Sequence, residues 1–578
     1  MRATIRRSSL LAPLVAALAA CGAPQSRTPA PVGPRGDAEP PRPVPRGGAY
    51  KPDLSKMRAV TRPERTGFRE TSSHADVLAF IDTLQAMDLP FTRGVMGRSS
   101  AGRDIPYMVL SRPRVNTPAD ARRLNRPIVY VQGNIHGGEV EGKEALQSLA
   151  RDLLTDRELN VLDSLVLIFV PIYNVDGNEK LGPQERNRPE QNGPELVGER
   201  TTGDQLDLNR DYIKAEAAET KAFLRFLNAW NPDAFVDLHT TDGTFHGYAV
   251  TYSPPLHPAS LVSGPYVRDT LLPELRRNLR STRRMETFDY GNVEVRDSVR
   301  GWYTYDYRPR YGTNYMGVRG RASVLVEAFS HDPFRERVAN MYTFTYDLLS
   351  IFAEAGFDLM DLASESDRRV TGWGTLPPSS PPVPLRAGFT PAATREPVLL
   401  EDLVPTGDSS RTEPGVPRGQ RRTGKVQRVT LPIFDRFTAT RSRPLPYAWA
   451  FPPGHDAALD LLRLHGVIVE RSDAPLEVEV ERFTVDTITR NTRVFQGHRE
   501  TRLEGRWNRL PRQVLPAGTL VVRAGQPLAI LAAQLLEAES ADGLVSWNVL
   551  DPGLTVGREF PIVRVLQPVV GRLTRVAP

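Results

Sequence analysis

The sequence predicts an α/β domain whose mixed, mostly parallel sheet is flanked by helices, followed by a smaller β-rich C-terminal domain. Apolar runs alternate with amphipathic stretches from about residue 73 to 357, and this alternation is typical of buried strands joined by helices. From about residue 428 onward the apolar runs are short, β-branched and alternating, which favours strands with one buried face. A chain of 578 residues is also too long for one ordinary hydrophobic core.

Four strands and four helices are expected in the α/β domain. The strands are nearly continuous in branched apolar residues, as strands buried on both faces are, and are expected at 127–135, 164–172, 234–239 and 322–328. The helices are amphipathic and are expected at 75–87, 141–154, 217–230 and 336–355. Because ligands bind outside the carboxyl ends of strands in such sheets, functional residues are expected where these strands end.

Proline content divides the rest of the chain. Residues 361–427 are proline-rich and are interpreted as a linker between an α/β domain at 73–360 and a β-rich accessory domain at 428–578. In the accessory domain strands are expected at 476–485 and 518–523, and helices at 455–465 and 528–536.

The first residues resemble a bacterial lipoprotein signal peptide. Three arginines precede an apolar run at 10–20, which is too short to span a bilayer and leads directly to Cys21, the only cysteine. The resemblance implies that residues 1–20 are removed and that Cys21 carries the lipid anchor, with the Pro-, Gly- and Arg-rich residues 21–72 as a tether. The alternative is an ordinary secretory signal with an incidental cysteine. We therefore expect a lipid-anchored protein of the bacterial cell envelope, with the outer membrane or periplasmic face favoured because glycine, not aspartate, follows the cysteine.

The net charge of +6 is distributed along the chain. Proteins that bind nucleic acid usually gather Lys and Arg on one stripe or in a run. We therefore expect no nucleic-acid partner.

The first candidate site residues follow the strand at 127–135. His136 and Glu139 are separated by two glycines and stand before the helix at 141–154, so an imidazole and a carboxylate lie about one helical turn apart. This pair is half of a zinc site, although a single His-x-x-Glu is a weak signal.

Two further strands end in residues of the same kind. His239 ends the strand at 234–239, and two histidines with one carboxylate, leaving a fourth position for water, are a ligand set of catalytic zinc sites. Glu327 lies near the end of the strand at 322–328. A carboxylate in so apolar a run is either paired with a neighbouring charge or positioned for proton transfer.

Taken together, these residues resemble the M14 family of metallocarboxypeptidases over roughly residues 73–356. The resemblance rests on the order His136-x-x-Glu139, Asn209-Arg210, His239 and Glu327. Three segments resemble further family signatures: 97–103 resembles Gly-x-Ser-x-x-Gly-Arg, 174–177 resembles Asn-Pro-Asp-Gly, and 207–211 resembles the family's Asn-Arg segment.

The resemblance implies a zinc carboxypeptidase-like fold, one Zn²⁺ per chain and a peptide substrate with a free C-terminal carboxylate. The implied zinc ligands are His136, Glu139 and His239, and Glu327 is the implied general base. Asn209 and Arg210 would bind the substrate carboxylate. One more arginine would stabilise the oxyanion, and Arg188 fits best by its distance from the segment at 174–177, with Arg186 as the close alternative.

Several points stay open in the sequence. No tyrosine can be chosen as the one that covers the substrate in digestive-type relatives; the candidates are Tyr303, Tyr305, Tyr307, Tyr311 and Tyr315. His246 and His331 fit a core or ligand-supporting role better than zinc ligation. The segments 495–498 and 542–548 resemble parts of large bacterial proteins that append such a domain to an M14 unit, and they are interpreted as packing or gating elements.

The leading functional hypothesis is removal of C-terminal residues from peptides by a zinc-dependent hydrolase. One alternative keeps the metal and changes the substrate to murein peptides or N-acyl amino acids. Another is a surface lipoprotein that binds peptides without catalysis, because a fold alone does not guarantee chemistry.

Overall fold

The computed structural model describes residues 59–577 apart from 391, 393 and 411–415, and these residues belong to one compact unit. The expected signal peptide, Cys21 and most of the tether therefore lie outside the described residues. Among the helices that are described, none has both the length and the apolar character that a membrane span requires.

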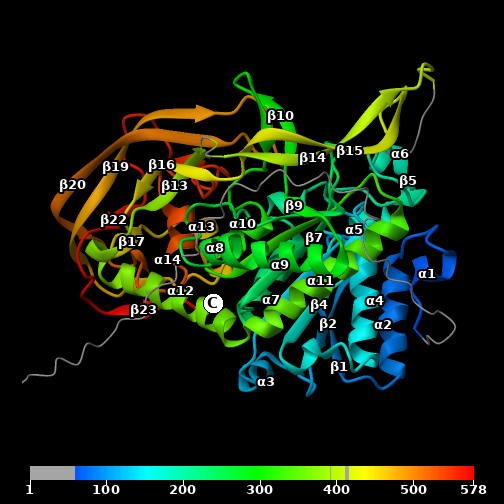
Figure 1. Cartoon of the computed structure of the whole chain (residues 1–578). Coiled ribbons are helices and arrows are strands. Elements are labelled where there is room, and N and C mark those ends of the chain that lie inside the picture. Colours follow the sequence, from blue (N-terminus) through cyan, green and yellow to red (C-terminus); the bar gives the residue numbers. More distant parts are fainter. Residues whose placement is uncertain (1–58, 391, 393, 411–415, 578) are drawn as a thin grey trace, which may run out of the picture. The chain divides into compact units, whose positions relative to one another are not determined.

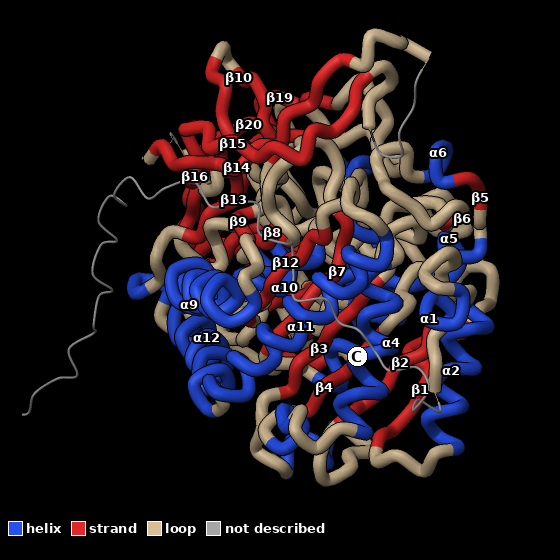
Figure 2. The backbone as a smooth tube through the Cα atoms, turned by 45° about the vertical axis from the view of Figure 1, so that its right-hand side comes forward, coloured by secondary structure: helices blue, strands red, loops and turns tan. Residues whose placement is uncertain are grey.

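An eight-stranded mixed sheet forms the centre of the molecule (Figures 1 and 2). Its strands, in spatial order, are β1 (Phe91–Arg98), β2 (Asp104–Leu110), β4 (Val166–Val170), β3 (Ile128–Gly133), β7 (Ala234–Thr240), β12 (Ala322–Ala328), β8 (Val250–Ser253) and β9 (Thr287–Asp289). The neighbours β4, β3, β7 and β12 run parallel. All four are fully buried, which explains their nearly unbroken apolar sequences. The four predicted strands are confirmed.

Helices flank this sheet, and four of them are the predicted ones: α2 (His74–Ala86), α4 (Glu141–Thr155), α7 (Ala218–Trp230) and α11 (Phe334–Ala355). A capping box fixes the start of α2, because Ser73 accepts a hydrogen bond from Asp76 N while the Asp76 carboxylate accepts one from Ser73 N. The shorter helices are α1 (Arg62–Thr66), α3 (Pro118–Arg123), α5 (Val175–Glu179), α6 (Gln184–Asn187), α8 (Ser263–Tyr266), α9 (Leu272–Asn278) and α10 (Gly312–Val318).

The C-terminal part is β-rich, as expected. A seven-stranded sheet has the order β20 (Thr501–Leu515), β19 (Leu476–Arg490), β22 (Val563–Val565), β17 (Ala448–Phe451), β21 (Leu520–Arg523), β18 (Glu470–Ser472) and β23 (Leu573–Arg575). The two predicted helices are α13 (Asp456–Leu464) and α14 (Ala529–Leu536). Smaller sheets pair β5 (Gly182–Pro183) with β6 (Leu196–Val197), and β13 (Val383–Phe389) with β16 (Phe437–Arg443).

The stretch interpreted as a linker, 361–427, is mostly regular structure, which corrects that expectation. It holds most of α12 (Phe357–Thr375), β13, β14 (Arg395–Pro405) and the start of β15 (Gln420–Phe434). β14 is the edge of a four-stranded sheet, β10 (Asn292–Arg296), β11 (Val299–Tyr303), β15, β14. Edge strands tolerate proline because one row of their N–H groups needs no partner, so proline content alone misled the prediction.

The two parts of the chain share one core. A single cluster of buried apolar side chains runs from Ala59 to Ile562, and β15 pairs in parallel with β11 at Trp302 and Ile433.

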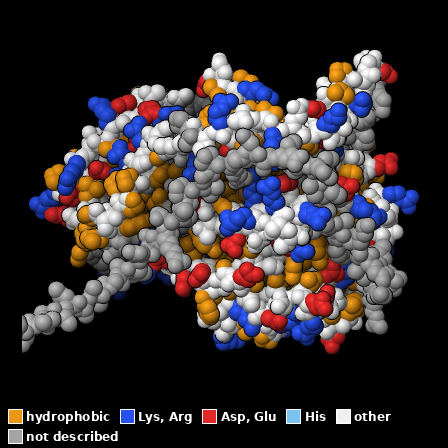
Figure 3. Space-filling model, in the orientation of Figure 1, with side chains coloured by type: hydrophobic (Ala, Val, Ile, Leu, Met, Phe, Trp, Pro, Cys, Tyr) orange, Lys and Arg blue, Asp and Glu red, His pale blue; other side chains and the backbone are white. Residues whose placement is uncertain are grey.

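On the face shown in Figure 3, basic and acidic side chains are interspersed.

Candidate active site

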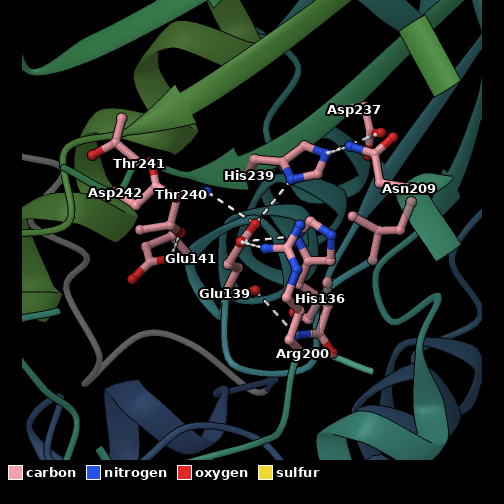
Figure 4. Close-up of polar contacts among 12 residues, drawn as sticks. His136, Glu139, Glu141, Arg200, Asn209, Asp237, His239, Thr240, Thr241 and Asp242 are labelled. Carbon is pink, nitrogen blue, oxygen red and sulfur yellow. Dashed lines mark hydrogen bonds and ion pairs between the residues drawn. The ribbon is translucent and has the colours of Figure 1, made fainter. Parts of the chain in front are cut away.

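Three predicted ligand residues meet at the carboxyl ends of β3 and β7 (Figure 4). One ligand atom from each of His136, Glu139 and His239 lies within 4.8 Å of the others, and all three side chains are buried. The Nδ1 atom of His136 lies 2.8 Å from Glu139 Oε1, and the Nδ1 atom of His239 lies 2.9 Å from Glu139 Oε2. Both imidazoles thus direct the same nitrogen toward one carboxylate.

The turn after β3 is shaped by close backbone packing. A Cβ atom on Gly137 would lie 2.3 Å from the carbonyl carbon of Gly177 and 2.5 Å from Glu199 O, so only glycine fits there. Asn134 adopts a φ of 60° and its Nδ2 donates to the carbonyl oxygens of His136 and Glu139 at 3.2 and 3.0 Å. The turn therefore holds His136 and Glu139 at a fixed separation.

A carboxylate lies beside the outer nitrogen of each histidine. His136 Nε2 lies 3.1 Å from Asp207 Oδ1, and His239 Nε2 lies 3.1 Å from Asp237 Oδ2. Such partners fix the tautomer and ring orientation of metal-binding histidines. Sequence reasoning assigned no role to either aspartate; the spacing of Asp237 and His239, two residues apart on one strand face, was the available signal.

Neighbouring charges shift the pKa values of the buried site residues and favour their charged forms. Burial raises the pKa of Glu139, but the neighbouring His136 and Arg188 outweigh it and hold that pKa well below the usual range. Burial likewise opposes ionisation of Asp207, and Arg200 with His136 keeps its pKa well below normal. Burial lowers the pKa of His239, yet Asp237 and Glu139 raise it well above normal.

These residues fit a divalent zinc ion. Two imidazole nitrogens and a carboxylate are a catalytic zinc donor set, and zinc binds such groups in their deprotonated forms. Within the described ranges, no other three His, Cys, Asp or Glu side chains bring their ligand atoms within 4.8 Å of one another.

Glu327 lies beside this cluster because of the strand register. β12 pairs with β7 in parallel with Glu327 directly opposite His239. Its side chain is buried, and its Oε2 has no hydrogen-bond partner among the described residues. Burial raises the pKa of Glu327 to about 8. The nearby charge of His239 lowers this pKa, whereas the charge of Glu139 raises it. A carboxylate this poorly solvated readily takes up a proton.

Asn209 lies beside His239, and Arg210 follows it in the chain. Asn209 Nδ2 lies 3.4 Å from His239 Nε2, while its Oδ1 accepts a hydrogen bond of 3.0 Å from Gly312 N. The guanidinium carbon of Arg210 lies 4.1 Å from the ring centre of Tyr311. The tyrosine stretch thus supports Arg210 through Tyr311, and the ring centre of Tyr305 lies 5.1 Å from that of Tyr311 with the two planes tilted by 56°.

Of the two arginines weighed from sequence, Arg188 reaches the site. Its Nη1 donates to Glu139 Oε1 at 3.1 Å and its Nη2 to the carbonyls of Thr240 and Thr241, both at 3.0 Å. Arg186 is bonded instead to its neighbour Asn187. A third arginine, Arg200, was not considered from sequence; its Nε donates to Asp207 Oδ2 at 2.9 Å and its Nη1 lies 3.6 Å from Glu139 Oε1.

The two remaining histidines near the motifs pack with aromatic rings. His331 stacks on Phe245 with ring centres 3.7 Å apart, and His246 lies 4.3 Å from Phe329. Neither belongs to the ligand cluster. A cavity of about 730 Å³ is lined by Tyr305 and by Tyr311, which contacts Arg210, and also by Gly388, Phe437 and Ser540.

Sequence comparison agrees with this geometry. Residues 77–315 match the family described as zinc carboxypeptidase, Peptidase M14. Carboxypeptidase 2 of Trichophyton tonsurans is 22% identical over 506 residues, covering 81% of each chain, and carboxypeptidase 2 of Trichophyton rubrum is 21% identical over 490 residues, also covering 81% of each. A metallo-carboxypeptidase from Burkholderia cenocepacia superimposes with a TM-score of 0.37 at 16% identity, over 49% of this chain and 70% of that chain.

The buried His-Glu-His cluster at the end of a mixed α/β sheet, together with the match to the zinc carboxypeptidase family, indicates a metal-dependent hydrolase. More narrowly, residues 77–315 form a domain that matches the M14 zinc carboxypeptidase family.

Proposed function

We propose that this protein removes C-terminal residues from peptides by zinc-dependent hydrolysis, with one Zn²⁺ per chain held by His136, Glu139 and His239. When bound, zinc acts as a Lewis acid that polarises the scissile carbonyl and makes water acidic enough to attack at neutral pH. Asp207 and Asp237 would orient the two histidines toward the ion.

The proposed general base is Glu327. It would accept a proton from the attacking water and pass it to the nitrogen of the leaving amino acid as the carbon–nitrogen bond breaks. The observation that carries the proposal is the position of this buried carboxylate, directly opposite the ligand His239 in the strand register and with one oxygen unpaired among the described residues. A site for binding alone would not need such a group.

Asn209 and Arg210 are proposed to bind the substrate's terminal carboxylate. A guanidinium can pair with a carboxylate through two parallel hydrogen bonds, which would fix which amide bond meets the metal. Tyr311 covers one face of the Arg210 guanidinium, and Nη1 donates to Asn209 O at 2.8 Å, so Nε and Nη2 are the atoms proposed to pair with the substrate.

An arginine beside Glu139 is proposed to stabilise the oxyanion. Arg188 is the residue expected from sequence, but its Nη1 and Nη2 already donate to protein acceptors. Arg200 donates a hydrogen bond through Nε and is therefore a second candidate. Substitution of the acting arginine by glutamine should lower kcat with little change in KM, and measuring both variants decides between them.

The test is release of free amino acids from a mixed peptide library by the form lacking residues 1–21. Glu327→Gln and a chelator-treated sample serve as controls, and metal content is measured in parallel. Wild type should release single C-terminal residues, and both controls should lose at least about 10²-fold in rate. An enzyme that binds one zinc per chain but releases nothing would contradict the substrate proposal and direct attention to murein peptides or N-acyl amino acids. A protein without stoichiometric zinc would instead favour the non-catalytic peptide-binding alternative.

Attachment to the cell envelope through a lipid on Cys21 is a separate proposal, supported by the sequence before the cysteine. Metabolic labelling with a fatty-acid analogue followed by membrane fractionation tests it. Wild type should be labelled and recovered with outer-membrane or periplasm-facing material, and Cys21→Ser should be neither. A labelled Cys21→Ser variant would contradict the proposed attachment point.

A further inference from the structure

A tight turn from the C-terminal part reaches the zinc-binding segment. The strands β19 and β20 form a long hairpin, and in its connecting loop Phe495 and His498 exchange two backbone hydrogen bonds of 2.8 and 3.0 Å. The two residues between them, Gln496 and Gly497, have φ values of 51° and 82°, as a type I′ turn requires. This turn fixes the position of the Gln496 side chain.

Gln496 contacts the backbone of a proposed ligand-orienting residue. Its Oε1 accepts a hydrogen bond of 2.8 Å from Asp207 N. The Asp207 side chain in turn lies 3.1 Å from His136 Nε2. His498 binds the same segment farther along, with its Nε2 2.7 Å from Glu216 Oε1. The hairpin turn therefore holds both ends of the segment 207–216.

A second contact comes from Asp542, which is completely buried against Arg310. Asp542 Oδ1 accepts from Arg310 Nε at 3.1 Å and from Nη2 at 2.8 Å, while Oδ2 accepts from Arg310 N at 2.8 Å. Trp547 donates to the same carboxylate at 2.9 Å and lies 4.5 Å from the Arg310 guanidinium carbon. Three donors from Arg310 thus fix its backbone and its side chain together.

The residues directly after Arg310 contact the proposed carboxylate-binding pair. Tyr311 lies under Arg210, and Gly312 N donates to Asn209 Oδ1. Because Asp542 holds Arg310 N, it fixes the chain one residue before Tyr311. Both contacts from the C-terminal part therefore end on groups that hold a proposed site residue in place.

We propose that the C-terminal part positions the active site through two residues. Gln496 holds Asp207 where it orients His136, and Asp542 holds Arg310 so that Tyr311 and Gly312 keep Arg210 and Asn209 directed at the substrate carboxylate. The inference rests on the proposed roles of Asn209 and Arg210. It gives the segments 495–498 and 542–548 a task beyond packing, and it makes Gln496 and Asp542 positioning residues without substrate contact.

Two conservative variants separate positioning from packing. Gln496→Asn keeps a residue that tolerates positive φ but shortens the side chain by one methylene, so its oxygen no longer reaches Asp207 N. Asp542→Asn keeps the size of the side chain and removes its charge. Arg493→Ala, at an exposed position in the same loop, is the matched control, and Asp542→Glu restores the charge.

The measurements are zinc affinity by chelator competition, KM and kcat with N-acetylated dipeptides, and the unfolding temperature. Gln496→Asn should weaken zinc binding about threefold to tenfold, less than the 10–100-fold expected for a residue that touches the ligand itself. Asp542→Asn should raise KM about tenfold with kcat changed far less, as loss of ground-state binding predicts. Asp542→Glu should recover part of that KM.

The outcomes distinguish this inference from the proposed function. If wild type hydrolyses no dipeptide, the proposed function fails, but zinc affinity still tests Gln496. Dipeptide binding to zinc-loaded protein with the Glu327→Gln change then tests Asp542 without turnover. The inference is overturned if Gln496→Asn and Asp542→Asn match Arg493→Ala in zinc affinity and KM, whatever their unfolding temperatures. Should Asp542→Asn fail to fold, the part-exposed Gln496 still gives a decisive result.

Discussion

At the scale of single residues, some residues of the site could be predicted from the sequence, whereas others are identified only by their contacts in the folded structure. His136, Glu139, His239 and Glu327 follow or end apolar strands, so strand prediction was enough to gather them at one sheet edge. Asp207 lies far from His136 in sequence, and its contact depends on a loop whose path no local pattern specifies. The tyrosines could not be ranked either, because their shared loop has no periodicity.

The carboxylate behind His239 should control metal affinity. Asp237→Asn removes the charge that orients His239 Nε2 but leaves all proposed ligands in place. We expect zinc affinity to fall about 10–100-fold, measured by chelator competition. Asp233→Asn changes the same residue type at the other end of the strand and is the control. Equal affinity in the two variants would contradict the orienting role.

A buried carboxylate away from the metal site should make stability depend on pH. Glu219 is fully buried near the start of α7, and burial, reinforced by Asp176, raises its pKa to about 7. A raised native pKa means that the native state binds the extra proton, so this group's stabilising effect is complete below about pH 4.5 and is lost as pH rises through about 7.

Glu219→Gln should therefore gain stability relative to wild type between about pH 4.5 and 7, by on the order of 1–3 kcal/mol, and show a constant difference above that. Urea unfolding at several pH values measures this. A stability difference that does not vary with pH would show that Glu219 titrates normally.

At the scale of elements, apolar pattern predicted the strands and helices of the catalytic part, whereas composition misplaced the linker. Buried strands such as β3 and β12 are readily predicted because most of their positions are apolar. The prolines of β13 and β14 lie in strands that need fewer N–H donors. Whether such a stretch forms a paired strand depends on a partner strand distant in sequence, here β16 for β13 and β15 for β14. The local sequence does not identify that partner.

The turn that joins β3 to α4 should not tolerate a single added methyl group at its first glycine. Gly137→Ala would place Cβ against the backbone of Gly177 and Glu199, so we expect the turn to shift, zinc to be lost and stability to fall by about 1–3 kcal/mol. Gly372→Ala in α12, where nothing lies within 4 Å of the new Cβ, should instead add up to about 1 kcal/mol. Metal content and thermal unfolding of both variants provide the test.

At the scale of the whole molecule, the catalytic and C-terminal parts should unfold together. They share one apolar core and a β11–β15 pairing, and Arg310 has its buried counter-charge in Asp542. A chain ending at Thr375 would leave that arginine without Asp542, which is expected to cost several kcal/mol. We expect one cooperative transition for the full chain, seen by circular dichroism and tryptophan fluorescence, and no soluble zinc-binding product from the shortened chain. A shortened protein that folds and binds zinc would contradict this.

The hydrogen bond between Gln496 and Asp207 also has a consequence for biosynthesis, because it can form only late. The proposed zinc ligands are synthesised first, but Gln496 and Asp542 emerge only near the end of translation. A nascent or C-terminally clipped polypeptide would therefore lack the contacts that Gln496 and Asp542 make. Under the positioning role inferred here, zinc affinity and substrate affinity reach their full values only when the entire chain has folded.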